Sequence, residues 1–357
     1  MTTERTLGTL RVGAIDCGTN SIRLLVADIA DAESAEGKSA GPMPTLHDVI
    51  REMVITRLGQ GVDKTGKLDP EAIDRTLTVT RNYQRQVEEL GVQRFRFVAT
   101  SATRDAKNRD VFVNGVRDIT GADPQVISGK EEARLSFTGA LSALPSGLSG
   151  PYMVVDIGGG STEFVLGTPG PAGGEVHQSI SIDMGSVRVT ERFSTTHPDG
   201  DQWGPENLDE ARRWIDAKLD EAQQAVDFAS ARTVVGVAGT VTSIAALIAG
   251  VNEYSPEVTH GLIPTPQQWA NAIKFMIQEP IVDKASLGFM PLGRADVIGG
   301  GALVWERILV RLGILADPAD DPSLSLDVHA GDSKTVAVVS EHDILDGLAL
   351  SLAQTRS

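Results

Sequence analysis

Apolar and polar positions follow two different periods along this chain, and their alternation predicts a layered α/β structure. A polar turn divides the apolar stretch 11–29 into two strands. Further apolar runs typical of strands occur at 49–55, 95–99, 124–127, 154–157, 164–167, 179–182, 233–238 and 336–340. Segments with helical spacing lie between them, at 69–90, 107–119, 206–226, 269–277 and 344–353, and further helices begin near 128, 239 and 293. Sheets covered by helices are therefore expected.

Local start and stop signals fix several of these helices. Asp69 is a good N-cap before Pro70, and Gly91 supplies the stop. Ser128 and Glu131 fit a capping box, which gives Glu131 a structural task. Glu132 has no such task, and we expect it to project from the first turn. The positive end of the helix would keep it ionised at neutral pH.

Four segments are predicted to be loops because they are rich in glycine, proline and polar residues. They are 31–45, 168–178, 194–205 and the acidic segment 316–334.

One glycine-rich turn carries the strongest chemical signal. An apolar run ends in Asp156, three glycines and Ser161 follow, and Glu163 opens the next apolar run. Glycines let backbone N–H groups approach a ligand, and such groups form a concavity that binds anions. The carboxylates suit a hard cation such as Mg²⁺.

The same pattern occurs earlier, where a strand ends in Asp16 and the turn 16–21 contains Gly18, Thr19, Asn20 and Ser21. The two aspartates lie 140 residues apart, a reasonable domain length. We interpret this as an internal repeat of two related lobes.

Two further polar segments follow strands. Gly239 and Thr240 lie at a strand-to-helix junction, where a helix N-terminus can bind phosphate. Ordinary capping by Thr240 is the alternative, and it would be preferred if the other two loops were absent. Arg104 ends a hydroxyl-rich loop after the strand 95–99, and Arg294 is either a surface residue at a helix start or a phosphate contact.

Length and composition limit the class of protein. A chain of 357 residues is long enough for two domains, and we place their boundaries at 1–128 plus 342–357 and at 129–341. No apolar run is long enough to span a membrane, and the N-terminus lacks a secretory pattern. One cysteine, Cys17, agrees with a reducing cytoplasm. A net charge of −16 with scattered basic residues argues against nucleic-acid binding, and the histidine spacing argues against zinc.

Several motifs in order along the chain resemble the exopolyphosphatase / guanosine pentaphosphate phosphohydrolase family. They are Ala14–Ser21 with Arg23 and Leu24, Ala99–Arg104, Val126–Leu135, Asp156–Glu163, Met184–Arg188, Gly239–Thr240 and Arg294–Ile298. The resemblance covers nearly the whole chain. It implies two actin-like (ribonuclease H-like) lobes with a central cleft and mixed sheets flanked by helices.

The resemblance also implies roles for individual residues. Glu132 matches the residue that positions and deprotonates the attacking water, and Glu163 matches a second essential glutamate. Asp16, Asp156 and Glu163 match carboxylates for Mg²⁺ or another divalent cation such as Mn²⁺. The phosphate-binding positions are Gly18, Thr19, Asn20, Ser21, Arg104, Gly158, Gly159, Gly160, Ser161, Arg188, Gly239, Thr240 and Arg294.

The expected reaction is hydrolysis of the terminal phosphoanhydride of inorganic polyphosphate in the cytoplasm, by a protein that could form a homodimer. Hydrolysis of guanosine pentaphosphate needs the same pocket and stays open, as do a kinase of the superfamily and a non-catalytic sensor. The chain lacks the extra C-terminal helical region of longer family members. It also has Leu345 before Asp346-Gly347, where the family pattern carries arginine before Glu-Gly; we expect this to affect packing more than chemistry.

Overall fold

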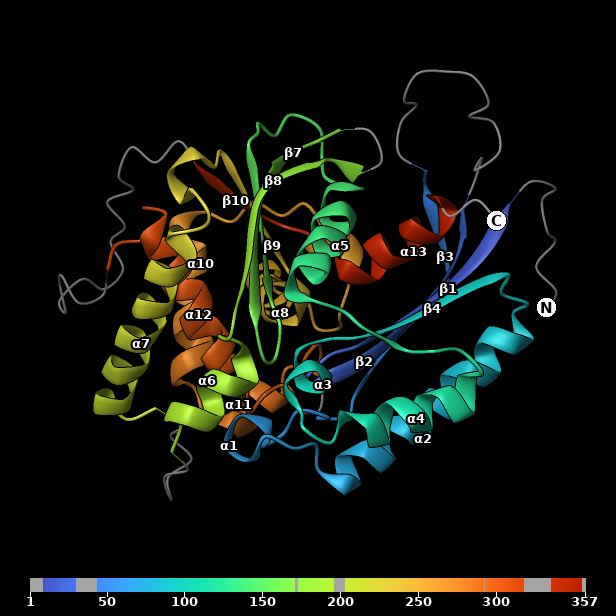
Figure 1. Ribbon diagram of the computed structural model, residues 1–357. Helices are drawn as coiled ribbons and strands as arrows, with labels where there is room; N and C mark the ends of the chain where they lie inside the picture. The colour runs from blue at the N-terminus through green and yellow to red at the C-terminus, as the bar shows by residue number, and fades with distance from the viewer. Residues whose placement is uncertain are drawn as a thin grey trace. The chain divides into compact units, whose positions relative to one another are not determined.

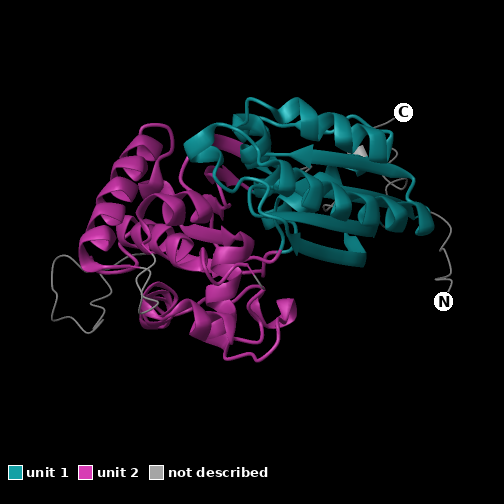
Figure 2. Ribbon diagram, turned by 90° about the horizontal axis from the view of Figure 1, so that it is seen from below, with its two compact units in different colours: residues 1–143, 169–175, 342–357 teal, residues 144–168, 176–341 magenta. Residues whose placement is uncertain are grey.

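A computed structural model describes residues 9–29, 44–170, 173–195, 203–291, 293–317 and 335–354. The predicted loops 31–45, 194–205 and 316–334 fall largely outside these residues. The chain divides into two compact units (Figure 2). Unit 1 contains Met1–Ala143, Pro169–Glu175 and His342–Ser357, and unit 2 contains Leu144–Thr168 and Val176–Glu341.

Unit 1 is built on a five-stranded mixed sheet with the strand order β3-β2-β1-β4-β5 (Figure 1). Strand β1 pairs antiparallel with β2 and parallel with β4. The bounds are β1 Leu10–Cys17, β2 Ser21–Ile29, β3 Leu46–Ile55, β4 Arg94–Ala99 and β5 Gln125–Val126. Its helices are α1 Val62–Thr65, α2 Pro70–Glu89, α3 Ser101–Asp105, α4 Arg109–Thr120, α5 Gly129–Leu141 and α13 Ile344–Gln354.

The period-two pattern of β1 explains how this sheet is covered on both faces. Ile15 and Cys17 join a core with residues of α2 and α4. Val12 and Ala14 point to the opposite face and join a core with residues of α5 and α13. Both sets are almost fully buried, as alternate side chains of a two-sided central strand must be.

Unit 2 repeats this topology. Its order is β10-β9-β6-β7-β8, in which β6 pairs antiparallel with β7 and parallel with β9, as β1 does with β2 and β4. The bounds are β6 Tyr152–Ile157, β7 Thr162–Thr168, β8 Glu175–Ile182, β9 Thr233–Val237 and β10 Val336–Val339. The helices are α6 Ser186–Phe193, α7 Pro205–Gln223, α8 Ala238–Ala249, α9 Pro256–Thr259, α10 Pro266–Gln278, α11 Ile281–Ala285 and α12 Ile298–Arg311, with a 3₁₀ turn at Phe228–Ser230.

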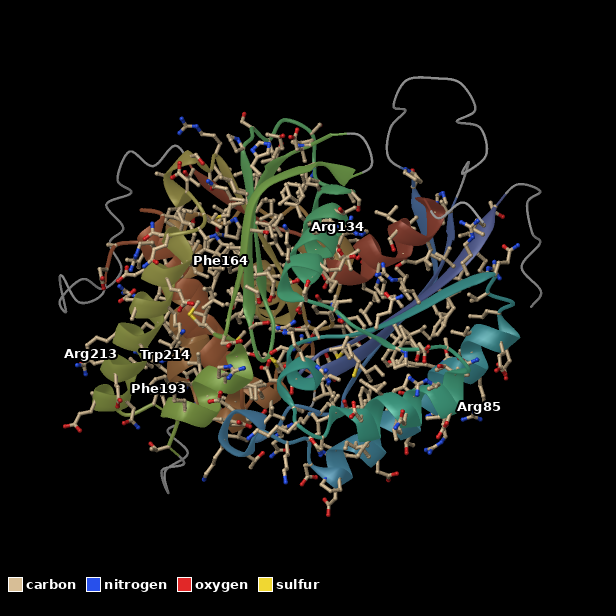
Figure 3. The ribbon with its side chains drawn as sticks, viewed as in Figure 1. Arg85, Arg134, Phe164, Phe193, Arg213 and Trp214 are labelled. Carbon is tan, nitrogen blue, oxygen red and sulfur yellow. The ribbon has the colours of Figure 1, made fainter. Side chains whose placement is uncertain are left out.

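Aromatic side chains fill the core of unit 2. Phe164 of β7 lies with its ring centroid 5.1 Å from that of Phe228 (Figure 3). Trp269 of α10 and Trp305 of α12 meet edge to face at 5.5 Å. Such pairs add stability beyond the area that they bury.

Three local predictions need correction. Residues 101–105 form the short helix α3 rather than a loop, and β8 begins at Glu175, inside the segment predicted to be a loop. Helix α12 begins at Ile298, later than expected from residue 293.

The division into units also differs from the predicted boundary in two respects: Pro169–Glu175 belongs to unit 1, and so do residues 129–143. Residues 129–143 were expected in the second lobe, but they group with unit 1. The reason is that α5 packs closely on α13: a Cβ at Gly139 would overlap the main chain at Asp343, and one at Gly347 would overlap the main chain at Leu135. Among the described residues, no helix is long and apolar enough to cross a membrane.

Candidate active site

The first candidate turn connects β1 to β2. The Gly18 N–H donates to the Ser21 carbonyl at 2.9 Å, which closes the turn. The segment after β3 holds it from outside, because Arg57 N–H donates to the Asn20 carbonyl at 2.9 Å and Gly59 N–H donates to the Thr19 carbonyl at 2.8 Å. Gly59 is required there because a Cβ would overlap the Thr19 side chain.

Asp16 lies at the base of this turn and is almost fully buried. In the hairpin register it is directly opposite Arg23, whose Nε and Nη2 donate to Asp16 Oδ2 at 3.1 and 2.7 Å. Burial raises the pKa of Asp16 despite the opposing effect of Arg23. Asp16 Oδ1 is buried and has no hydrogen-bond partner among the described residues, so it is available as an acceptor for a ligand or hydrated cation.

Glu132 and Arg104 form the second feature of unit 1. Ser128 caps α5 by accepting from the Glu131 N–H at 3.2 Å, and the Glu131 carboxylate pairs with Arg134. Glu132, in the first turn, is buried and accepts from Arg104 Nη1 at 3.0 Å. Arg104 Nη1 also donates to the Ile127 carbonyl at 3.2 Å, so α3 and α5 together fix this ion pair.

The glycine turn between β6 and β7 repeats the first turn. The Gly158 N–H donates to the Ser161 carbonyl at 3.0 Å, the same bond as that between Gly18 and Ser21. The start of α6 holds this turn, because the N–H groups of Ser186 and Val187 donate to the carbonyls of Gly158 and Gly159, each at 2.9 Å. The family-like motif 184–188 therefore has a physical role in the support of the glycine turn.

Two residues of that motif have individual tasks. Gly185 must be glycine, because a Cβ would overlap the Gly159 carbonyl. Arg188 Nε donates to the Gly160 carbonyl at 2.8 Å, and Arg188 Nη2 lies 3.8 Å from Asp183 Oδ1. Arg188 thus binds the turn itself and places a cation beside it.

Asp156 and Glu163 are direct partners across the β6–β7 hairpin, so their side chains share one face of the sheet. Both are buried. Glu163 Oε1 accepts from Ser161 Oγ at 2.8 Å and from Ser181 Oγ of β8 at 2.6 Å. A pair of carboxylates on one face fits a divalent cation, which would remove the repulsion between like charges placed opposite each other.

The described residues of neither unit form a cluster of three or more His, Cys, Asp or Glu side chains that could hold a metal ion. A smaller set still suits Mg²⁺, because this ion keeps several waters and uses one or two carboxylates together with substrate phosphates. Asp156 and Glu163 meet that requirement in unit 2.

The last group of predicted residues lies around the start of α8. No side chain caps this helix, and Thr240 lies inside its first turn, so capping by Thr240 does not account for the motif. Ala238, the first residue of α8, has a positive φ of 65°, which is uncommon outside glycine. This conformation sets the direction in which the helix leaves β9. Arg294 Nη1 donates to Ser243 Oγ at 3.1 Å, and its guanidinium packs on Gly239, where a Cβ would overlap it.

The structure thus collects the predicted residues into one set in each unit. Unit 1 holds Asp16, Gly18, Thr19, Asn20, Ser21, Arg104 and Glu132. Unit 2 holds Asp156, Gly158, Gly159, Gly160, Ser161, Glu163, Arg188, Gly239, Thr240 and Arg294.

Sequence reasoning assigned no task to Ser181, Ser243 or Gly59. The pairing of Arg23 with Asp16 could have been found, since a hairpin centred between Thr19 and Asn20 places these two residues opposite each other.

The two mixed sheets flanked by helices, with one loop-bearing hairpin in each unit, define the two-lobed actin-like fold. Residues 32–316 match the model of the Ppx/GppA phosphatase family, and the chain belongs to this family. It is 43% identical over 348 residues to exopolyphosphatase 2 of Mycobacterium tuberculosis, a match that covers 96% of this chain and 98% of the relative.

Solved structures agree with this assignment. An exopolyphosphatase-like protein is 38% identical and aligns with a TM-score of 0.81 over 96% of this chain and 97% of its own. The Ppx/GppA family member of Aquifex aeolicus is 28% identical and aligns with a TM-score of 0.70 over 98% of this chain and 100% of its own.

Proposed function

We propose that this protein is an exopolyphosphatase that hydrolyses the terminal phosphoanhydride of inorganic polyphosphate. The observation that carries the proposal is the nearly full-length similarity to exopolyphosphatase 2 of Mycobacterium tuberculosis. The residues of both units supply the groups that such a reaction needs, namely a buried carboxylate, paired carboxylates, arginines and glycine turns.

In the proposed mechanism, Glu132 orients a water molecule and accepts its proton as the oxygen attacks the terminal phosphorus. The bond from that phosphorus to the bridging oxygen breaks, and orthophosphate leaves a chain that is one phosphate shorter. Arg104 holds Glu132 in one orientation through the bond at 3.0 Å. Phosphoryl transfer needs chiefly such positioning, together with neutralisation of charge.

In this proposal each turn binds phosphate oxygens through its own backbone N–H groups and hydroxyls. The contributing positions are Gly18, Thr19, Asn20, Ser21, Gly158, Gly159, Gly160, Ser161, Gly239 and Thr240, with Arg188 and Arg294 as fixed cations. Asp156 and Glu163 would hold Mg²⁺, and Asp16 would offer its Oδ1 as an acceptor. The bound ion supplies positive charge for the phosphate oxygens.

Release of orthophosphate from purified protein with Mg²⁺ tests the proposal, with polyphosphates of several lengths, guanosine pentaphosphate and ATP as separate substrates. Orthophosphate from polyphosphate supports it. Release from guanosine pentaphosphate alone would assign the other activity in the family name. Binding of polyphosphate without release would make the protein a sensor, and ADP formation that depends on an acceptor would make it a kinase.

We also propose that the protein is cytoplasmic and forms a homodimer. Fractionation of cells and the mass of the purified protein in solution check these two parts.

A further inference from the structure

Asp343, just before α13, is buried and binds in two directions. Its Oδ1 accepts from the Leu345 N–H at 3.0 Å, which caps the helix, and its Oδ2 accepts from Arg23 Nη1. The Asp343 carboxylate therefore holds both the start of α13 and one side of the Arg23 guanidinium on β2.

The other two nitrogen atoms of the Arg23 guanidinium bind Asp16. Arg23 Nε and Nη2 both donate to Asp16 Oδ2, at 3.1 and 2.7 Å. A planar guanidinium bound on both sides cannot rotate without breaking bonds on one of them. Asp343 thus holds Arg23, and Arg23 holds Asp16 with its Oδ1 left as acceptor.

The main chain of Asp343 also contacts α5, the helix that carries Glu132. Its carbonyl lies so close to α5 that a Cβ at Gly139 would overlap it. Gly139 is two turns after Glu132 on that helix. One residue thus contacts both the arginine that binds Asp16 and the helix that carries Glu132.

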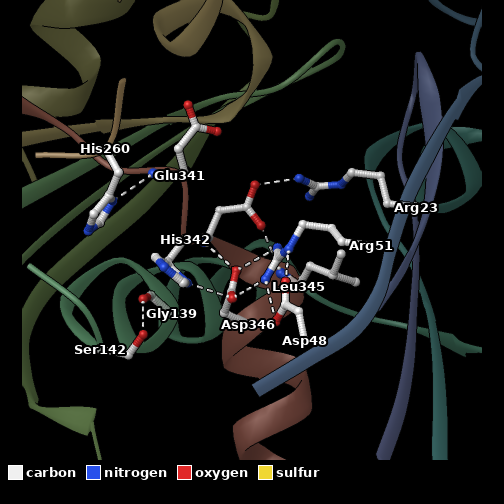
Figure 4. Close-up of polar contacts among 11 residues, drawn as sticks. Arg23, Asp48, Arg51, Gly139, Ser142, His260, Glu341, His342, Leu345 and Asp346 are labelled. Atoms are coloured by element: carbon white, nitrogen blue, oxygen red, sulfur yellow. Dashed lines mark hydrogen bonds and ion pairs between the residues drawn. The ribbon is translucent and has the colours of Figure 1, made fainter. Parts of the chain in front are cut away.

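Asp346, on the same helix, offers a natural comparison. It is also buried, but it binds Arg51 of β3, whose Nη2 donates to Asp346 Oδ1 at 2.5 Å (Figure 4). Arg51 otherwise pairs with Asp48 and not with Asp16. Asp346 Oδ2 also accepts from the Asp343 N–H at 3.0 Å, so both aspartates support the start of α13. Of the two carboxylates, that of Asp343 is the one that binds Arg23.

We propose that Asp343 is a positioning residue for hydrolysis, which acts through Arg23 to hold Asp16 and through its main chain to hold the helix of Glu132. This inference rests on the proposed function. It extends the role of the terminal segment from packing to chemistry, through a residue that touches neither water nor phosphate.

The test compares Asp343→Asn with Asp346→Asn. Asparagine at 343 keeps the Oδ1 that caps α13 but presents an amide donor to Arg23 in place of an acceptor. We expect kcat to fall by about 10²-fold, as for a misplacement of about 1 Å. Asp346→Asn keeps an amide oxygen that can accept from the Asp343 N–H but loses the acceptor for Arg51. It should lower the melting temperature by a similar amount and leave kcat near wild type. Equal effects of both variants on kcat would reduce Asp343 to an anchor of the helix and overturn the proposal.

A double-mutant cycle with Arg23→Gln gives a second readout that simple destabilisation does not move. Asp343→Asn should add little to the loss of kcat in Arg23→Gln, because the two residues act in series, whereas additive losses would contradict the proposal. The same cycle is also measured on the affinity for magnesium tripolyphosphate. This measurement separates the role of Asp343 from the proposed hydrolysis itself. If folded wild-type protein releases no orthophosphate, the proposed hydrolysis has failed. The coupling in affinity still decides whether Asp343 controls the turn 16–21.

Discussion

Arg23 and Glu163 occupy the same position in two hairpins of identical register, each directly opposite the aspartate that precedes the turn. In unit 1 this places an arginine against Asp16, and the pair is an internal ion pair. In unit 2 it places a second carboxylate against Asp156. The two hairpins therefore share one backbone arrangement and differ in one charge: the hairpin of unit 2 pairs two carboxylates, whereas that of unit 1 pairs a carboxylate with an arginine.

The first prediction concerns Glu132. Glu132→Gln should lower kcat by about 10²–10⁴-fold, because the amide cannot accept the proton of the attacking water. The melting temperature should stay near that of the wild type, since the amide oxygen can still accept from Arg104. Release of orthophosphate from polyphosphate measures the effect.

Glu131→Gln is the matched control for this prediction. Glu131 lies in the same helical turn but binds Arg134 on the surface, so its variant should keep nearly full activity. Equal losses in the two variants would show that charge at the start of α5, rather than a base at Glu132, supports the reaction.

The second prediction concerns the carboxylate pair of unit 2. Glu163→Gln should raise the Mg²⁺ concentration for half-maximal activity by about tenfold or more, the size of effect seen for disturbed metal sites. Without Mg²⁺ the variant should be at least as stable as the wild type, because one of two facing charges is gone. Activity and melting temperature, each titrated with Mg²⁺, check both parts.

Glu175→Gln, at the exposed start of β8, serves as the control and should leave the Mg²⁺ requirement unchanged. An unchanged requirement in Glu163→Gln would remove this residue from the metal site.

The third prediction concerns Gly185. Gly185→Ala should destabilise unit 2 by about 1–3 kcal/mol, because the new Cβ meets the Gly159 carbonyl and a close-packed site tolerates such overlap poorly. The affinity for polyphosphate should fall as well, since the glycine turn moves. Urea unfolding and calorimetric binding measure these effects. Gly170→Ala has room for its Cβ and should be tolerated; a similar loss there would mean that the overlap at Gly159 is not the cause.

The fourth prediction is a dependence of stability on pH through His342. Burial lowers the pKa of His342, but the hydrogen bond to Asp346, with Nδ1···Oδ1 at 2.8 Å, and its charge outweigh burial and raise the pKa. Arg51 opposes this effect, and Asp48 reinforces it. A raised pKa in the folded state stabilises the protein fully below the ordinary value of about 6.5, and this contribution is lost as pH rises through the raised pKa.

His342→Gln should therefore be less stable than the wild type at pH 5.5 and equally stable at pH 9. Urea unfolding across this range measures the difference. A constant difference at all pH values would show that His342 contributes through packing alone.

Sequence patterns predicted the repeated hairpins, the α/β alternation and most strands, because each depends on local periodicity and turn chemistry. They also singled out the residues of both turns, since glycines next to carboxylates at strand ends are typical of turns that bind phosphate or a cation. Three findings depend on contacts across the fold. The support of the glycine turn by Gly185, the packing of Arg294 on Gly239 and the assignment of 129–143 to unit 1 all require distant residues to meet.

The terminal helix shows the same limit. The pattern predicted a helix at 344–353, and α13 covers Ile344–Gln354. It also drew attention to Leu345-Asp346-Gly347 as a departure from the family. It could not show that Arg51 of β3 is the partner of Asp346, because nothing local connects residues so far apart in the sequence.

The two end segments of unit 1, Met1–Ala143 and His342–Ser357, are separated along the chain by the whole of unit 2. During synthesis, unit 2 is thus complete before the residues that pair with Arg23 and Arg51 have been made. Until then Arg23 and Arg51 lack their partners Asp343 and Asp346, and the sheet face that packs on α13 is only partly covered. A chain interrupted before residue 342 would lack both Asp343 and α13, so we expect its sheet to keep only α5 on that face.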